Sequence, residues 1–239
     1  MKALLWSLLS GIVLFPSVAV AQNEYVLVAK GSEGLIRAYD TKVRDVKASI
    51  PATPGRDTAC GQIGQGELTA FYCPESRSIY ITEKTLRAVG DRFGPEGIAT
   101  LVAHEYAHAR LHAVQGFTRD VIWSSVIDEL QADCVAGVYM KSATPIEMTA
   151  RMVQNSASFV ESIGDYLILE KDWHGTPQMR RAAFLHGYKG GELSSCVASS
   201  KPTVNQIIEQ STDTIQKQVN DPESELNRLL QWGNNLLKN

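Results

Sequence analysis

Three of the five histidines lie in one short segment, VAHEYAHARLHA, which spans residues 102–113. Within it, His104, Glu105 and His108 form an H-E-x-x-H pattern. If the segment is a helix, His104 and His108 lie one turn apart on the same face, about 6 Å along the axis, so both imidazoles can reach one ion. Glu105 then lies ~100° around the helix, where it can hold and deprotonate a metal-bound water. The pattern therefore predicts a zinc centre with its own general base.

His112 continues the four-residue spacing but does not fit as a third ligand. It lies about 12 Å along the helix axis from His104, whereas a zinc–nitrogen bond is only ~2 Å long, so one ion cannot bind both side chains. The third-histidine pattern of the metzincins, H-E-x-x-H-x-x-G-x-x-H, is also absent. We expect His112 to be a polar position at the end of the helix.

The third ligand is expected from the next apolar segment, VIWSSVIDELQADCVAGVYM, which carries Asp128, Glu129 and Asp133. Glu129 and Asp133 are four residues apart and share a helix face. Burying carboxylates on an apolar helix is costly unless they are paired or bind a metal. We expect Glu129 to bind the metal and Asp133 to accept the free ring N–H of a ligating histidine. The alternative is that Asp128 and Glu129 face solvent at the edge of the helix.

The remaining sequence predicts an α+β fold that is predominantly helical with a small antiparallel sheet. Apolar spacing, caps and breakers indicate helices over residues 83–94, 97–114, 121–140, 145–170 and 179–188. The helix over 145–170 is expected to begin at a capping box, TPIE, with proline at its first position. Two short β-type runs, ELTAFY and SIYIT, are separated by a proline-containing turn and predict an antiparallel pair.

The N-terminal segment MKALLWSLLSGIVLFPSVAVAQN has the features of a signal peptide. One lysine precedes a short apolar run that ends in Ala-Val-Ala, so we expect cleavage after Ala21 and a periplasmic or secreted mature protein. An uncleaved anchor is the alternative, because the uncharged run nearly reaches the ~20 residues of a membrane span. No later apolar run is long enough to span a membrane, so we expect no span after signal cleavage.

Charge and length constrain the partners and the domain organisation. The formal net charge is −3, with no basic stripe or tail, which argues against nucleic acid or anionic lipid as a main partner. Residues 22–200 suffice for one large domain. Residues 201–239 are polar but keep apolar residues at helical spacing. We therefore expect a helical C-terminal tail that docks on the domain, on a partner or on a second copy.

Four cysteines, Cys60, Cys73, Cys134 and Cys196, lie in the part expected to be exported. An even number in an oxidising compartment indicates disulfides, and four cysteines allow three pairings. Cys60 and Cys73 bracket the glycine-rich segment CGQIGQGELTAFYC, which could close a local loop. We therefore favour Cys60–Cys73 together with Cys134–Cys196. A zinc ribbon is the competing interpretation, but the sequence has no C-x-x-C pair.

Several segments resemble the bacterial neutral zinc metallopeptidase family. HEYAH followed by ELQADCVAG resembles the H-E-x-x-H helix and E-x-Q-A-D-C-x-A-G motif of that family. ACG and AFYCPESRSIYI resemble its upstream segments, and IGDY, HGTPQMRRAAFLHGY and Cys196 its downstream ones, so the resemblance covers about residues 57–197. The E-x-x-x-D pairing is similar to the gluzincins, which implies a zincin-like catalytic domain. Ala107 and Tyr166 depart from the family pattern, which has glycine and aspartate there, but neither change removes an expected ligand.

The resemblance also singles out His174 and Arg180 in the segment HGTPQMR. In the gluzincins a downstream histidine or arginine steadies the oxyanion or orients the acidic residues, which implies catalytic roles for this pair. The alternative is structural: Arg180 would pair with a carboxylate such as Asp165, and His174 would cap a helix. The resemblance to zincins further implies an edge strand that pairs with extended substrate, and SIYIT is the segment expected to form it.

These observations predict an exported zinc metallopeptidase that hydrolyses peptide bonds of protein or peptide substrates. His104, His108 and Glu129 would hold Zn²⁺, and Glu105 would activate the zinc-bound water. The alternative is a non-catalytic, disulfide-stapled module of the cell envelope that binds zinc or a partner. The intact Glu105 argues against this alternative, because a purely structural zinc site has no need of a base.

Overall fold

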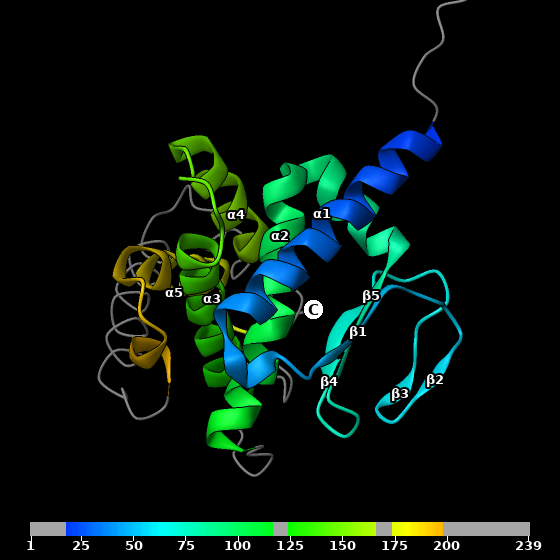
Figure 1. The fold of residues 1–239 in the computed structure, drawn as a ribbon, viewed down its shortest axis with the longest axis horizontal. Helices are drawn as coiled ribbons and strands as arrows, with labels where there is room; N and C mark the ends of the chain where they lie inside the picture. The colour runs from blue at the N-terminus through cyan, green and yellow to red at the C-terminus, as the bar shows by residue number, and fades with distance from the viewer. Residues whose placement is uncertain (1–17, 117–123, 166–173, 198–239) are drawn as a thin grey trace, which may run out of the picture.

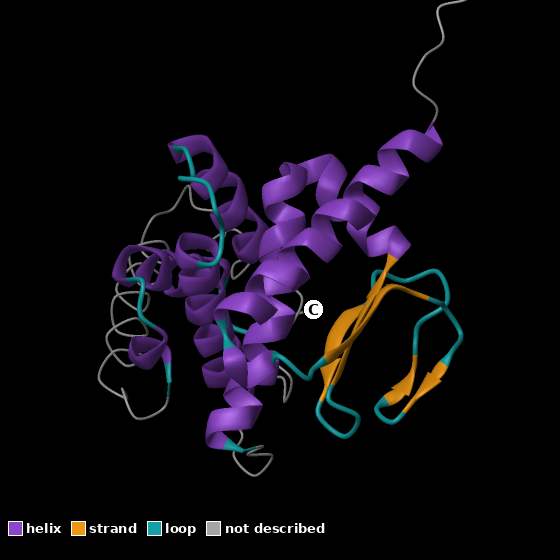
Figure 2. Cartoon of the chain, viewed as in Figure 1, coloured by secondary structure: helices purple, strands orange, loops and turns teal. Residues whose placement is uncertain are grey.

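The computed structural model describes residues 18–116, 124–165 and 174–197. Most of the expected signal peptide and the whole of the expected C-terminal tail lie outside the described residues. Helices make up most of the described chain, and two small sheets lie to one side of them (Figures 1 and 2). The helices are α1 (Val18–Tyr39), α2 (Glu83–Gln115), α3 (Ser124–Ser142), α4 (Ala150–Ser162) and α5 (Pro177–Gly190), with short 3₁₀ turns at Thr41–Val43 and Leu193–Cys196.

A three-stranded mixed sheet packs beside the helices. Its strands are β1 (Lys47–Ala52), β4 (Ala70–Cys73) and β5 (Ser78–Thr82), in the order β1-β5-β4. β4 and β5 pair antiparallel, as the sequence predicted, whereas β1 adds a parallel strand on the other side of β5. A separate short hairpin is formed by β2 (Asp57–Thr58) and β3 (Gly61–Gln62). The fold is therefore α+β and mainly helical, as expected.

The prediction that SIYIT forms the edge strand is wrong. This segment is β5, which lies between β1 and β4, and all five of its residues are buried. Its neighbour β1, with the sequence KASIPA, contains a proline and a lysine and gave no clear strand pattern in the sequence. Because β1 covers one side of β5 and β4 the other, the edges of the sheet are β1 and β4.

α2 joins two of the predicted helices through a kink. Thr82 caps its first turn, where its side-chain oxygen accepts a hydrogen bond from the Thr85 amide. Gly94 has a φ of 69°, a left-handed conformation that favours glycine, and Pro95 follows it. The predicted glycine stop is therefore present, but a second helical stretch starts at once. That stretch carries HEYAH, in which only the second histidine is more than slightly exposed.

α4 begins later than the sequence predicted. Its N-cap is Thr149, whose side-chain oxygen accepts a hydrogen bond from the Met152 amide. Thr144, the residue expected to form the cap, instead donates its hydroxyl hydrogen to the Met140 carbonyl, in the last turn of α3. Thr144 thus bonds to the preceding helix and does not cap α4, which starts at Ala150.

α3 and α5 cross with their backbones in direct contact. A Cβ added at Gly187 would lie 1.8 Å from the carbonyl oxygen of Cys134, and one added at Gly137 would lie 2.1 Å from that of Phe184. Real Cβ atoms do not approach a carbonyl oxygen so closely, so no side chain fits at either position. Packing between the two helices therefore requires both glycines.

Both disulfides favoured from the sequence are present. Cys60–Cys73 joins the β2–β3 hairpin to β4, and Cys134–Cys196 joins α3 to the 3₁₀ turn that follows α5. The second of these is buried in the main hydrophobic core. All four cysteines are used, so the zinc-ribbon interpretation is excluded.

Candidate metal centre

α2 and α3 bring His104, His108 and Glu129 together. One potential ligand atom of each residue lies within 4.8 Å of those of the other two. The Nε2 atoms of His104 and His108 are 3.1 Å apart. The two carboxylate oxygens of Glu129 lie 3.3 Å from His104 Nε2 and 3.4 Å from His108 Nε2. The two histidines come from one face of α2, and the carboxylate approaches them from the neighbouring helix.

The donor atoms and their spacing fit a zinc ion. Ligands held at about 2.0–2.1 Å from a tetrahedral zinc ion lie about 3.3 Å from one another. The two imidazole Nε2 atoms, 3.1 Å apart, are close to this value, and each of them lies 3.3–3.4 Å from a different carboxylate oxygen of Glu129. Two imidazole nitrogens and one carboxylate oxygen are also a donor set found in catalytic zinc sites, which leave a fourth position for water or substrate.

The electrostatic surroundings favour positive charge at this point. Burial alone would lower the pKa of His104, but the neighbouring Asp133 and Glu129 carboxylates outweigh burial and raise the pKa to about 10. Carboxylates that stabilise a positive imidazole also stabilise a metal cation in the same place. The charges of the buried residues therefore agree with the ligand spacing.

Asp133 lies behind His104 and is fully buried. Its Oδ1 atom is 3.0 Å from Nδ1 of His104, the ring nitrogen that faces away from Glu129. The geometry between these two atoms falls outside that of a hydrogen bond, so Nδ1 has no hydrogen-bond partner among the described residues. In metal sites a carboxylate at this position fixes the orientation of a ligating histidine.

Arg180, in α5, connects the two carboxylates. Its Nε and Nη2 atoms donate to the two oxygens of Asp133, at 2.7 Å and 3.0 Å, and Nη2 also lies 2.9 Å from Glu129 Oε2. Burial would raise the pKa of Glu129, but Arg180 and the two histidines hold that pKa well below its usual range. The sequence left open a pairing of Arg180 with Asp165; the observed carboxylate partners are Asp133 and Glu129 instead.

Glu105 lines the same cleft as the two histidines and is buried. Burial raises its pKa, and the nearby His104 and His108 oppose that rise. A carboxylate whose pKa lies above its usual value accepts a proton from water more readily than an ordinary one does. The position and environment of Glu105 are therefore compatible with the general base expected from the sequence.

Asp128 precedes Glu129 on α3 and also lines the cleft. Burial raises the pKa of Asp128 to about 6, with Glu129 adding to the rise and His108 opposing it. The alternative that both acidic residues face solvent does not hold, because the side chain of Glu129 is turned toward the histidines and mostly buried.

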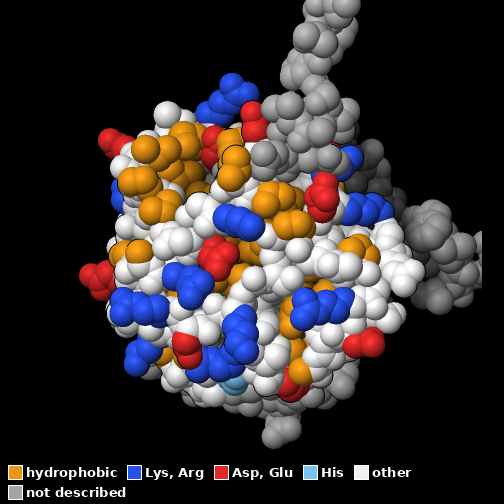
Figure 3. Space-filling model, turned by 45° about the vertical axis from the view of Figure 1, so that its right-hand side comes forward, with side chains coloured by type: hydrophobic (Ala, Val, Ile, Leu, Met, Phe, Trp, Pro, Cys, Tyr) orange, Lys and Arg blue, Asp and Glu red, His pale blue; other side chains and the backbone are white. Residues whose placement is uncertain are grey.

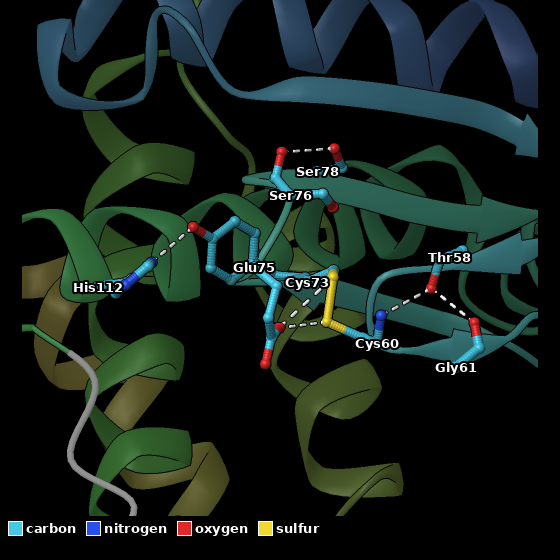
Figure 4. The surroundings of a disulfide bond; sticks show 9 residues. Thr58, Cys60, Gly61, Cys73, Glu75, Ser76, Ser78 and His112 are labelled. Atoms are coloured by element: carbon cyan, nitrogen blue, oxygen red, sulfur yellow. Dashed lines mark hydrogen bonds between the residues drawn. A yellow bond between two sulfur atoms is a disulfide. The ribbon is translucent and has the colours of Figure 1, made fainter.

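His112 contacts the sheet rather than the other two histidines. Its Nδ1 atom lies 2.8 Å from the hydroxyl oxygen of Tyr72, a residue of β4. Figure 4 shows His112 in the surroundings of the Cys60–Cys73 disulfide. Cys73 lies in β4, next to Tyr72. The hydrogen bond ties α2 to β4. Tyr72 was missed by the sequence reasoning, and the only signal that marks it is the FYC segment of the family resemblance.

His174 precedes α5 and lies at the rim of the cleft. Its side chain is half exposed, and its Nδ1 atom lies 3.5 Å from Oδ2 of Asp165. The alternative that His174 caps α5 is wrong, because Thr176 is the N-cap and accepts a hydrogen bond from the Met179 amide. His174 is therefore oriented by a carboxylate and free to face a ligand in the cleft.

One cleft of about 620 Å³ is lined by the three expected ligands and their neighbours: Tyr72, His104, Glu105, His108, His112, Asp128, Glu129, His174 and Arg180. Its walls come from β4, both halves of α2, α3, the end of α4 and the segment around the start of α5. This volume is within the range of small-molecule and peptide sites. Glu105, His108 and Glu129 therefore lie in a cleft that a ligand can enter.

The charged side chains on one face of the described surface are mixed in sign. On the face drawn in Figure 3, Lys and Arg side chains are interspersed with Asp and Glu side chains rather than gathered into a uniformly basic area. Among the described residues, no helix combines the length and the apolar character needed to cross a membrane.

Comparisons with known proteins agree with the geometry. The family model described as "Putative neutral zinc metallopeptidase" matches residues 52–199. The chain is also 27% identical to "Uncharacterized protein Rv2575" of Mycobacterium tuberculosis over 172 residues and 28% identical to "Uncharacterized protein YpfJ" of Escherichia coli over 165 residues. These matches cover 57% and 58% of this chain, and only 59% and 56% of the two relatives. No solved structure was found to match.

Proposed function

Because the chain belongs to the Putative neutral zinc metallopeptidase family, we propose that it is an exported zinc-dependent peptidase. His104, His108 and Glu129 hold the ion. The observation that carries this proposal is the convergence of their donor atoms: the two imidazole nitrogens lie 3.1 Å apart, and each lies within 3.4 Å of a carboxylate oxygen of Glu129. Export is supported by the two disulfides, which persist in oxidising compartments.

Glu105 is the group that moves protons. When bound, zinc supplies a Lewis acid that polarises the substrate carbonyl and makes a coordinated water more acidic. Glu105 accepts a proton from the attacking water while the oxygen of that water bonds to the carbonyl carbon of the substrate. When the C–N bond breaks, Glu105 returns this proton to the leaving amine, so the products are a carboxylic acid and an amine.

Arg180 and His174 have different roles in this proposal. Every hydrogen bond described for Arg180 goes to Asp133, Glu129, His104 or a backbone carbonyl, so it acts as a positioning residue for the zinc ligands. His174 is exposed to the cleft and held by Asp165. It is the group suited to donate a hydrogen bond to the oxyanion that develops on the substrate carbonyl.

β4 provides an edge for the substrate main chain. The Thr82 amide donates to the Thr69 carbonyl, so this pair of residues bonds across the β4–β5 ladder. Because facing pairs alternate in an antiparallel ladder, the N–H and C=O groups of Ala70 and Tyr72 point away from β5, toward the open edge. Both residues line the cleft. We infer that an extended peptide pairs with β4, in place of the edge first expected at SIYIT.

Zinc content and two substitutions test the proposal. The mature protein, purified from an exported and oxidised preparation without added metal, is expected to contain about one zinc ion per chain. His108→Ala should lose the zinc, whereas Glu105→Gln should retain it and lose peptide hydrolysis. Folded protein that stays free of zinc after zinc is supplied would refute the ligand set. A wild-type protein that holds zinc but hydrolyses no peptide would favour the non-catalytic module.

A further inference from the structure

Asp40 is a buried carboxylate that the proposed mechanism does not use. It is 4% exposed and lies between α1 and the first 3₁₀ turn, of which it is the N-cap. It also lies outside residues 52–199, the part of the chain that the family model matches. Burial of a charged side chain is unfavourable unless hydrogen bonds and an opposite charge compensate for it. The partners of Asp40 therefore indicate what this carboxylate does.

Asp40 joins α2 to α3. Its Oδ2 atom accepts one hydrogen bond from Nη1 of Arg110, at 2.5 Å, and another from the hydroxyl of Tyr139, at 2.7 Å. Its Oδ1 atom accepts a hydrogen bond from the Lys42 amide, which holds the carboxylate in place. Arg110 belongs to α2 and Tyr139 to α3, so a single oxygen atom bonds to both helices. We call Asp40, Arg110 and Tyr139 the clamp.

The surroundings of the clamp strengthen its hydrogen bonds. Tyr139 is fully buried, and the side chain of Arg110 is only 15% exposed, so the charges are little screened by solvent. Hydrogen bonds to an ionised group are roughly twice as strong as those between neutral groups. Burial and the negative charge of Asp40 raise the pKa of Tyr139 well above its usual value, so the hydroxyl keeps the proton that it donates.

The two helices that the clamp joins carry the proposed zinc ligands. α2 carries His104 and His108, and α3 carries Glu129. Arg110 is only two residues from His108, and α1 crosses α2 and ends next to α3 (Figure 1). The two imidazole nitrogens lie 3.3 Å and 3.4 Å from the Glu129 oxygens, so a small shift of one helix along the other would separate the ligands.

We propose that Asp40 is a positioning residue of the zinc centre. Through Arg110 and Tyr139 it holds α2 and α3 in the relative position at which the ligands of both helices converge. A site whose ligands converge before the metal arrives binds that metal more tightly, because less ordering is needed on binding. This inference rests on the zinc ligands of the proposed function and extends the site to a residue that precedes the part of the chain matched by the family model.

The test measures zinc affinity in folded protein, so it does not depend on turnover. Metal-free mature protein with intact disulfides is titrated with zinc in competition with a chromogenic chelator, after circular dichroism has shown that each variant is folded. Asp40→Asn removes the charge of the clamp, and the milder Tyr139→Phe removes only one hydroxyl. Each should bind zinc roughly 3- to 30-fold more weakly than the wild type.

Ile36→Val is the matched control. Ile36 is 3% exposed and lies one turn before Asp40, on α1. The substitution removes one buried methylene group and so lowers stability, but it leaves all three residues of the clamp in place. Its zinc affinity should therefore equal that of the wild type.

A double variant tests whether the clamp acts as a unit. Arg110→Met detaches the clamp from α2, and Tyr139→Phe detaches it from α3. Because either change breaks the same link, the double variant should bind zinc about as weakly as the weaker of the two single variants. Two independent effects would instead multiply.

The outcomes separate this inference from the proposed function. Wild-type zinc affinity in both Asp40→Asn and Tyr139→Phe would overturn the clamp and leave the ligand set intact. Equal weakening in Ile36→Val, or effects that multiply in the double variant, would also overturn it. Weaker zinc binding in the clamp variants of a protein whose wild-type form hydrolyses no peptide would support the clamp and refute the peptidase. A wild-type protein that binds no zinc would refute both.

Discussion

Replacement of Arg180 by methionine is expected to destabilise the zinc-free protein by about 3–5 kcal/mol. The guanidinium is 2% exposed and contacts two buried carboxylates, those of Asp133 and Glu129. Methionine fills much of the same volume but removes the guanidinium from both carboxylates, which then have only the His104 imidazole to offset their two charges. The expected cost is that of breaking a buried ion pair by removing one partner, which leaves an uncompensated charge in the interior.

The adjacent residue on α5 provides a matched control. Arg181 forms an ion pair with Glu161 at 3.1 Å, but its side chain is 27% exposed and that of Glu161 is 39% exposed. A pair in contact with solvent contributes about 0.2–1 kcal/mol. Arg181→Met is therefore expected to cost at most a third of what Arg180→Met costs, although the two changes are chemically identical and affect neighbouring positions of one helix.

Urea denaturation, followed by circular dichroism, measures both changes. The two variants should be compared in the presence of a metal chelator and without reductant, so that zinc binding and the disulfides contribute equally to each. Similar free energies of unfolding for Arg180→Met and Arg181→Met would refute the reasoning. A second readout is zinc affinity, which should fall roughly 10- to 100-fold in Arg180→Met because Glu129 and Asp133 lose the group that orients them.

Three further changes test separate parts of the structure. Gly187→Ala should cost about 1–3 kcal/mol of stability by overpacking, whereas Gly190→Ala, at an open position of the same helix, should be neutral or stabilising. Thermal denaturation of the two variants measures the difference. Equal effects would contradict the close crossing of α3 and α5. Thr149→Ala should cost about 1 kcal/mol of stability, because the N-cap of α4 is lost. If Thr144→Ala lowers the stability more in the same assay, α4 begins at Pro145, as the sequence first suggested. His112→Ala should retain about one zinc ion per chain by elemental analysis, and loss of the metal would show that the third histidine is a ligand after all.

Helices and strands with a clear local sequence pattern were predicted correctly. HEYAH lies in an uninterrupted apolar stretch, and the two β-type runs flank a short turn, so both were recognised from the sequence. α1 and β1 gave only weak patterns. α1 contains two glycines and β1 contains a proline, and both elements depend on packing against α2 and β5 rather than on their own propensities.

The site shows the same division. The spacing of His104 and His108 is a property of one helix, so it followed from the sequence. The approach of Glu129 depends on how α3 packs against α2, which no local pattern fixes. It was expected because a buried carboxylate needs a partner and because the segment resembles the acidic motif of the family. For Arg180 the family resemblance implied either a role at the oxyanion or orientation of the acidic residues, and no local pattern chose between them. The edge position of β4 was not foreseen, because it depends on which strands become neighbours in space.

The close crossing of α3 and α5 gives a physical reason for the spacing in ELQADCVAG. Glu129, Asp133 and Gly137 recur every four residues and therefore share one face of α3. On α5, Arg180 lies seven residues before Gly187, also on one face, so the arginine meets the carboxylates where the glycines let the backbones touch. A longer distance between the helices would withdraw Arg180 from Asp133. The same contact that packs the two helices thus holds Arg180 against Glu129, the proposed zinc ligand, and Gly187→Ala should weaken zinc binding as well as stability.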